Sequence, residues 1–252
     1  MSRRKNILIT GATGGVGYET ALRLLGEGYD VQVTGRNAES LAELEAAGAA
    51  VYRTDLLEDG APDRLLEDIR SPDVVIFSAG TGVFALSQDT ADAETERMFA
   101  LNVISPIAIT KRLLPGWLAR GHGHFIYIGS QAGKVATPKA AVYAATKHAL
   151  IGYTNALRME VRSSGIDVTV INPGPIDTAF LDSADDTGNY RQSVGRHLLT
   201  PVEVADAAVS AVRKPVREVD LPRIMAVTSK LHAVAPRMTE RLGRRFFLKK
   251  ME

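Results

Sequence analysis

Short β-branched or apolar runs alternate along this chain with longer segments that have the periodicity of helices. The expected buried strands are NILIT (6–10), DVQVT (30–34), AVYRT (50–54), DVVIFS (73–78), HFIYIG (124–129), DVTVI (167–171) and RIMAV (223–227). The helical patterns between them cover residues 18–28, 38–48, 62–69, 91–119 and 139–162. Strands separated by helices favour parallel pairing and a sheet that is covered on both faces. We therefore predict a doubly wound α/β fold with a mostly parallel seven-stranded sheet and helices on both faces.

The domain organisation follows from length and from the lack of linkers. No Pro-, Gly- or Ser-rich linker and no internal repeat divides the 252 residues, so we expect one domain over residues 1–252. The polar residues 181–199 fit neither period and are expected to form a substrate lid, with a plain surface excursion as the alternative. Residues 229–252 are expected to form a basic, helical C-terminal extension.

Composition excludes several classes of function. A net charge of +1 gives no global attraction to nucleic acid, and the absence of cysteine excludes disulfides, thiolate metal sites and cysteine nucleophiles. No apolar run is long enough for a transmembrane segment, and we expect a cytoplasmic protein. The basic end either packs Phe246 and Phe247 on its own domain or touches an anionic surface. No metal is expected, because the histidines make no recognised ligand spacing with carboxylates: His122, His124, His148, His197 and His232.

The first strand, a glycine-rich turn and a helix follow one another in NILITGATGGVGYETALRLL. This order places backbone N–H groups and a helix N-terminus where a pyrophosphate can bind, as in Rossmann-type folds. Gly11 is expected to permit the tight turn, Gly15 the approach of the phosphates, and Gly17 close helix–strand packing. The spacing matches T-G-x-x-x-G-x-G and, through Gly14, also T-G-x-x-G-x-x-G. The predicted cofactor contacts here are Thr10, Gly11, Thr13, Gly15, Val16 and Gly17.

Arg36 follows the second strand in VTGRN, where an NAD-binding chain usually has a carboxylate for the ribose 2′-hydroxyl. A guanidinium there suits a 2′-phosphate, so NADP(H) is predicted in preference to NAD(H). The carboxyl ends of the third and fourth strands are expected to contribute further cofactor contacts, because ligands bind at this edge of such sheets. These contacts are Asp55, Leu56, Ser78, Ala79 and Gly80.

Tyr143 and Lys147, in AVYAATKHAL, are four residues apart and would share one face of a helix. With TGATGGVG, Asn102 in ALNVISP, Ser130 in YIGSQAG, YAATK and NPGPIDT, the chain resembles the classical short-chain dehydrogenase/reductase family over essentially its whole length. The second glycine spacing also matches the extended branch, which includes nucleotide-sugar epimerases. The stretch after Gly174 is short for the extended branch, which favours the classical branch. At residues 78–80, SAG stands where the family more usually has N-A-G.

The resemblance implies a catalytic role for four residues. Tyr143 would be the general acid/base, with its pKa lowered by Lys147, which would also bind the nicotinamide ribose. Ser130 would hold the substrate oxygen, and Asn102 would anchor a water that relays protons between Lys147 and solvent. The family also places NPGPIDT over the nicotinamide, which adds Pro173, Gly174, Ile176 and Thr178 to the cofactor contacts.

The function implied is that of an NADP(H)-dependent oxidoreductase that transfers hydride between the nicotinamide and a carbonyl compound or secondary alcohol. The alternative is a catalytically silent NADP(H)-binding redox sensor or interaction protein. The partners implied are a small-molecule substrate and further copies of the chain, in a homodimer or homotetramer formed through the helices at 91–119 and 139–162. Gln131, Val135, Phe180 and residues 181–199 are expected to shape the substrate pocket, but they do not identify the substrate.

Overall fold

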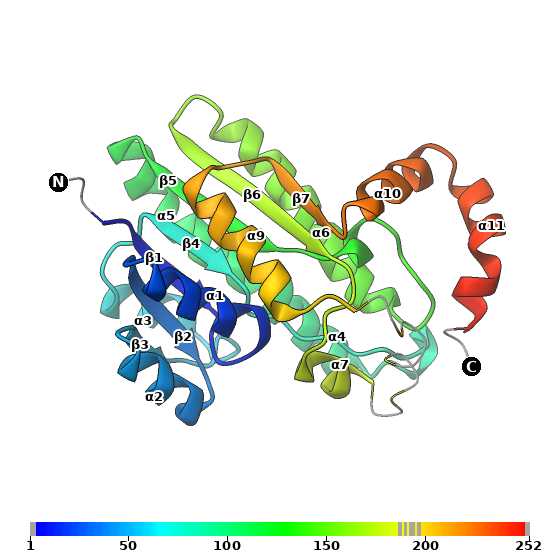
Figure 1. The fold of residues 1–252 in the computed structure, drawn as a ribbon, viewed down its shortest axis with the longest axis horizontal. Coiled ribbons are helices and arrows are strands. Elements are labelled where there is room, and N and C mark those ends of the chain that lie inside the picture. Colours follow the sequence, from blue (N-terminus) through cyan, green and yellow to red (C-terminus); the bar gives the residue numbers. More distant parts are fainter. Residues whose placement is uncertain (1–3, 186–187, 189–190, 192–194, 196–197, 250–252) are drawn as a thin grey trace.

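Seven parallel strands form one sheet at the centre of the structure, in the order β3-β2-β1-β4-β5-β6-β7 (Figure 1). The structure is a computed structural model that describes residues 4–185, 188, 191, 195 and 198–249, with side chains as far as Gly243. The strands are β1 (Asn6–Thr10), β2 (Asp30–Gly35), β3 (Ala50–Arg53), β4 (Val74–Phe77), β5 (Gly123–Ile128), β6 (Ile166–Pro173) and β7 (Glu218–Leu221). The predicted α/β fold is confirmed, with all six neighbouring pairs parallel.

Helices cover both faces of the sheet. The longer ones are α1 (Gly15–Gly26), α2 (Ala38–Ala46), α3 (Ala61–Asp68), α4 (Asp92–Phe99), α5 (Ser105–Arg120), α6 (Ala141–Glu160), α7 (Ala179–Ala184), α9 (Pro201–Arg213), α10 (Ile224–Val234) and α11 (Pro236–Lys249). Apolar side chains of α1, α2 and α9 pack in one core cluster, and those of α3, α5 and α6 pack in the other. Successive residues of β1 join opposite clusters, and all five of its residues are buried. A continuous apolar run is therefore what this strand needs, because both of its faces meet helices.

The order of the strands reverses direction between β1 and β4. The chain runs outward from β1 through β2 to β3, and then crosses to β4 on the other side of β1. In open parallel sheets such a switch point leaves a crevice at the carboxyl ends of the strands, where ligands bind. The segments that follow β1 and β4 flank this crevice, so the fold itself indicates where a functional site lies.

Two predicted elements differ from the structure. The seventh strand is Glu218–Leu221, which pairs with β6, and the predicted strand 223–227 is wrong because those residues lie in and just before α10. A partly polar run, EVDL, forms this strand because it lies at the edge of the sheet, where one side has no neighbour. The predicted helix 91–119 is divided by a π-helical turn, η2 (Ala100–Ile104), between α4 and α5.

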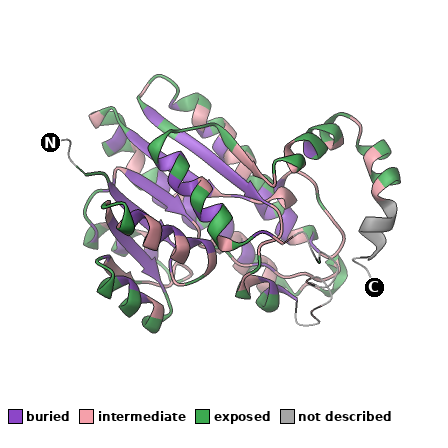
Figure 2. Ribbon diagram, viewed as in Figure 1, coloured by how far each residue is buried: buried purple, intermediate pink, exposed green. Residues whose placement is uncertain are grey.

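The C-terminal helices α10 and α11 extend from the end of the sheet that also carries α7 (Figure 1). Figure 2 shows that these two helices are mostly exposed or half-buried, in contrast to the buried strands. Within the described ranges, every helix is too short or too polar to span a bilayer. Of the predicted lid at 181–199, residues 186–187, 189–190, 192–194 and 196–197 lie outside the described residues.

Candidate active site

A cavity of about 1130 Å³ opens at the carboxyl ends of the strands and includes the switch point. Most of the predicted site residues line it. From the glycine loop and the ends of β2, β3 and β4 these are Gly11, Thr13, Gly15, Val16, Arg36, Asp55, Leu56, Ser78, Ala79 and Gly80. From the second half of the chain they are Ser130, Tyr143, Lys147, Pro173, Gly174, Ile176 and Thr178. The predicted residues that do not line the cavity are Thr10, Gly17 and Asn102.

The glycine loop packs so closely that side chains at two positions would collide with backbone. Gly11 has φ +68°, and a Cβ there would lie 2.5 Å from the Cα and N of Ala79. A Cβ on Gly17 would lie 2.3 Å from the carbonyl oxygen of Gly11. Gly17 therefore packs against the backbone of the turn and supports it, and it does not line the cavity. Thr10 is buried beneath the loop, and its Oγ1 accepts a hydrogen bond from Ala79 N at 3.4 Å.

The start of α1 opens onto the same cavity. The helix begins at Gly15 after Gly14, and no side chain caps its first N–H groups. A Cβ on Gly14 would meet nothing within 4 Å, so the backbone here faces open space. Uncapped N–H groups and the helix dipole together favour an anion at this position.

Arg36 lies at the end of β2, as predicted, but it is not free of carboxylates. Its Nη1 is 3.6 Å from Oδ2 of Asp55, and two thirds of the Arg36 side chain is exposed to solvent. The sequence alone did not indicate this contact, because it depends on the parallel register that places the end of β3 next to the end of β2. Asp55 is itself fixed by Leu57 N, which donates to its Oδ1 at 3.0 Å.

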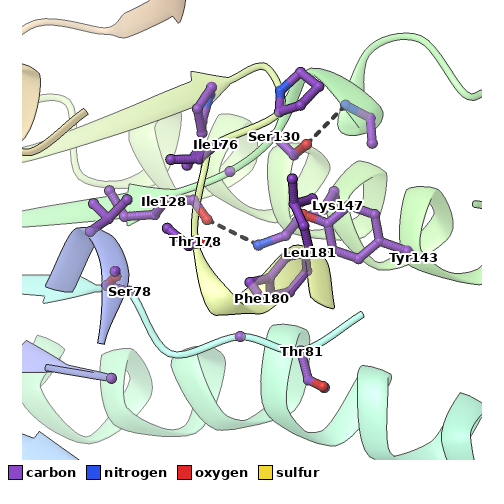
Figure 3. Close-up of a pocket in the computed structure, with 18 of the residues that line it drawn as sticks. Ser78, Thr81, Ile128, Ser130, Tyr143, Lys147, Ile176, Thr178, Phe180 and Leu181 are labelled. Carbon is purple, nitrogen blue, oxygen red and sulfur yellow. Dashed lines mark hydrogen bonds between the residues drawn. The ribbon is translucent and has the colours of Figure 1, made fainter. Parts of the chain in front are cut away.

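Tyr143 and Lys147 lie on the buried face of α6 and point into the cavity (Figure 3). Lys147 Nζ donates to the carbonyl oxygen of Ile128 at 3.1 Å and lies 5.8 Å from the centre of the Tyr143 ring. Burial raises the pKa of Tyr143 to about 12, opposed by a hydrogen bond with Ser130. Burial also lowers the pKa of Lys147 to about 8. For Tyr143 desolvation is the larger of these two effects, and it favours the neutral phenol.

Ser130 follows β5 and shares the cavity with Tyr143. Its Oγ accepts a hydrogen bond from Ala132 N at 3.1 Å, which holds the hydroxyl at the start of the short η3 helix (Gln131–Gly133). The Ser130 hydroxyl can therefore bond both its own loop and the phenol of Tyr143. The structure brings Ser130, Tyr143 and Lys147 together as the sequence predicted.

Asn102 lies in the π-helical turn, a feature that often occurs at functional sites. Its Oδ1 accepts from Thr81 N at 2.9 Å, and its Nδ2 donates to Thr81 O at 2.8 Å and to Thr146 Oγ1 at 3.1 Å. Gly80 separates it from the lysine, since a Cβ there would lie 3.3 Å from Asn102 Oδ1 and 3.8 Å from Lys147 Nζ. The side chain of Asn102 thus holds the segment after β4 against α6.

An ion-pair network behind Ser130 was not predicted from the sequence. Lys134 Nζ lies 2.7 Å from Oδ1 of Asp220 and 2.8 Å from Oε1 of Glu218, both on the edge strand β7. Gln131 Nε2 also donates to Asp220 at 2.8 Å, so its amide binds the sheet although the residue lines the cavity. The sequence prediction placed the seventh strand at 223–227, so it gave no reason to pair Lys134 with Glu218 and Asp220. The network fixes the Ser130 segment to the edge of the sheet.

Aromatic side chains enclose Tyr143 on the substrate side. The ring centres of Phe84 and Phe180 lie 5.7 Å and 5.8 Å from that of Tyr143. Figure 3 shows the Phe180 and Tyr143 side chains in this part of the cavity. Gly82 makes room for this arrangement, since a Cβ there would lie 2.7 Å from Phe180 Cζ. Phe180 and Val135 line the cavity as predicted, whereas Phe84 had no recognisable signal in the sequence.

The cavity fits a dinucleotide on its own geometry. The glycine turn and uncapped helix provide N–H groups for a pyrophosphate, and Arg36 with Asp55 lies where an adenosine ribose would bind. Within the described part of the chain, no group of three or more His, Cys, Asp or Glu side chains is placed to hold a metal ion. The fold is of the doubly wound α/β class, and the lining of its cavity suits a dinucleotide.

Comparison with known proteins identifies the family. A family model described as short chain dehydrogenase matches residues 5–189, and the chain belongs to the short-chain dehydrogenase/reductase family of oxidoreductases. Uncharacterized oxidoreductase YbbO of Escherichia coli K12 is 34% identical over 189 residues, which cover 73% of this chain and 70% of YbbO. Dehydrogenase/reductase SDR family member 7B of Bos taurus is 33% identical over an alignment of 264 positions, which covers 95% of this chain and 80% of that protein.

Solved structures agree with this assignment. The closed form of a serine dehydrogenase complexed with NADP+ is 27% identical, with a TM-score of 0.80, covering 86% of this chain and 94% of its own. A short-chain dehydrogenase from Streptomyces avermitilis is 25% identical with a TM-score of 0.83, covering 96% of this chain and 97% of its own. The second match extends over nearly all of both chains.

Proposed function

We propose that the protein is an NADP(H)-dependent oxidoreductase that interconverts a carbonyl compound and a secondary alcohol. The observation that carries the proposal is the common cavity, in which Ser130, Tyr143 and Lys147 lie beside a glycine loop fitted to a dinucleotide. A protein that only bound the nucleotide would need the loop but not this buried group. The serine dehydrogenase with bound NADP+ supports the choice of cofactor by similarity.

The chain's own residues would hold the cofactor along the cavity. N–H groups of the loop and of the start of α1 would bind the pyrophosphate, and Arg36 would bind the 2′-phosphate. Asp55 competes for Arg36 at 3.6 Å, so the arginine would exchange one anionic partner for another. Thr178 lies directly beside the loop, since a Cβ on Gly15 would lie 3.1 Å from its Cγ2. The bound nicotinamide would supply or accept the hydride at the substrate carbon.

Tyr143 would supply the proton. With its pKa near 12 the phenol is neutral at physiological pH, which is the form that donates a proton to a carbonyl oxygen during reduction. The Ser130 hydroxyl would orient the substrate oxygen. Lys147, buried behind the phenol, would stabilise the phenolate that remains once the proton has left. Asn102 would act by holding the Thr81 segment in place. A water bound at Asn102 that relays protons between Lys147 and solvent is a further part of the proposal.

The alternative is a silent NADP(H)-binding sensor, which would bind the nucleotide but turn nothing over. Incubation of the protein with NADPH or NADH and a panel of ketones, aldehydes and alcohols, followed by nucleotide absorbance, separates the two. We expect nucleotide oxidation with at least one carbonyl compound and a preference for NADPH. Tight NADPH binding without turnover of any compound would favour the sensor.

Association into a homodimer or homotetramer is also part of the proposal. The segments expected to form the interface expose large apolar side chains: Ile104, Leu118 and Met159 are 59%, 48% and 71% exposed. Such side chains on the outer face of packed helices suit burial against another copy. Sedimentation analysis tests this directly. The cytoplasmic location stays a prediction from the sequence.

A further inference from the structure

The cavity continues past Tyr143 onto the C-terminal helices. Beyond the aromatic side chains its lining includes Met225 and Leu231 of α10 and Leu242 of α11. Met225 anchors this wall at the end of β6, since a Cβ on Gly174 would lie 3.1 Å from its sulfur. The first turn of α10 thus adjoins the proposed site of chemistry, and the rest of the helix leads away from it.

The described residues that line the far end of the cavity include no unpaired arginine, lysine or carboxylate. Among the described lining residues the charged or titratable side chains are Arg36, Asp55, Arg97, Tyr143, Lys147 and His232. Arg36 and Asp55 belong to the nucleotide end, and Lys147 lies behind Tyr143. Arg97 is paired with Glu94, with Nη2 and Oε2 2.6 Å apart, and His232 Nδ1 lies 2.9 Å from Thr239 Oγ1. A carboxylate or phosphate on the substrate would find no unpaired arginine or lysine among the described lining residues at this end.

Apolar side chains on this wall are unusually exposed. Leu231 is 45% exposed and Leu242 is 77% exposed, although both line the cavity. The 11 residues of α10 make a wall roughly 16 Å long. Exposed apolar surface that is continuous with a catalytic cavity is typical of a ligand-binding groove. The wall is therefore suited to cover an elongated apolar ligand.

We propose that the substrate is an uncharged aldehyde or ketone with a long aliphatic part. Its carbonyl oxygen would lie at Ser130 and Tyr143, and its chain would pass Phe84 and Phe180 and follow α10 towards Leu242. The proposal rests on the proposed function, because it assigns the substrate class of the same site. The reaction stays that of the proposed function, with hydride transferred to the carbonyl carbon and the Tyr143 proton to its oxygen.

A homologous series of linear 2-ketones, from butan-2-one to dodecan-2-one, tests the class. Each buried methylene should raise kcat/KM with NADPH about fourfold until the chain has covered the wall. A carboxylate at the far end of the longest ketone should reverse the gain. Turnover that is independent of chain length, or faster with the carboxylate, would overturn the proposal while leaving the proposed function intact.

The test can also be made without turnover. Calorimetry measures the affinity of the corresponding 2-alkanols for the protein with and without NADP+. If neither these ketones nor any compound of the panel is turned over, the proposed function fails, but affinity should still rise with chain length if the wall binds aliphatic ligands. Affinity that does not depend on chain length would overturn the assignment of the wall.

Leu231→Lys and Val234→Lys form a matched pair on α10. Leu231 lines the cavity, whereas Val234 is 86% exposed and is not part of the lining. Leu231→Lys should raise KM for dodecan-2-one at least about tenfold more than it raises KM for butan-2-one, and Val234→Lys should change neither. Equal effects of the two variants would contradict the proposal. An unchanged KM together with an altered sedimentation coefficient in Leu231→Lys would also contradict it, since the apolar face of α10 would then be an interface between copies.

Discussion

The contact between Gly11 and Ala79 lets the cost of a side chain in the glycine loop be worked out from the structure. Gly11→Ala puts an alanine at φ +68° and places its Cβ 2.5 Å from two backbone atoms of Ala79. The left-handed conformation costs about 1–2 kcal/mol and the overpacking about 1–3 kcal/mol. We therefore expect the free energy of unfolding to fall by about 2–5 kcal/mol.

Gly28→Ala is the matched control, because Gly28 has φ +78° and a Cβ there would meet nothing within 4 Å. It should lose only the conformational part, about 1–2 kcal/mol, and should bind NADPH like the wild type. Gly11→Ala should also weaken NADPH binding at least about tenfold, because the clash displaces Ala79 on the cavity wall. Equilibrium unfolding in denaturant and nucleotide titration measure the two effects. Equal losses of stability in both variants would show that the loop does not press on Ala79.

Three further outcomes are expected. Arg36→Asp should weaken NADPH about tenfold or more and not NADH, as measured by titration; equal affinities in the wild type would refute the assignment of Arg36. Asn102→Ala should lower the free energy of unfolding by about 2 kcal/mol, because Thr81 loses both partners; an unchanged unfolding midpoint would count against this clamp. Burial lowers the pKa of His124 from 6.5 to about 4, so the unfolded chain binds more protons between these values and stability is lost as pH falls through them. The loss should be about 3 kcal/mol in the wild type and absent in His124→Gln, and an equally acid-sensitive variant would refute it.

The sequence predicted the placement of the glycine loop and of the Tyr143–Lys147 pair because their spacing is local. Gly11, Gly15 and Gly17 act within one turn, and Tyr143 and Lys147 within one helix, so short motifs carry their geometry. Because ligands bind at the carboxyl ends of the strands in such sheets, motifs at those ends could be assigned to one site without any knowledge of side-chain packing.

The features missed from the sequence depend on contacts between distant segments. Asp55 approaches Arg36 only through the register of β3 on β2, and Lys134 finds its partners only once β7 is placed at the sheet edge. The misplaced strand had a simple cause, since RIMAV is apolar like a buried strand, whereas an edge strand such as EVDL tolerates charge. The pKa of Tyr143 also depends on burial by the whole fold, which outweighs the hydrogen bond with Ser130.

The proton-donor role of Tyr143 is tested most directly by the single-turnover rate of hydride transfer from bound NADPH to a carbonyl substrate in Tyr143→Phe. Tyr153→Phe, which changes a tyrosine of the same helix that does not line the cavity, is the control. We expect Tyr143→Phe to lower the rate at least about 10²-fold with nearly unchanged NADPH affinity, and addition of Lys147→Ala to slow it scarcely further. A Tyr143→Phe protein that keeps most of its rate would contradict the role assigned to this tyrosine.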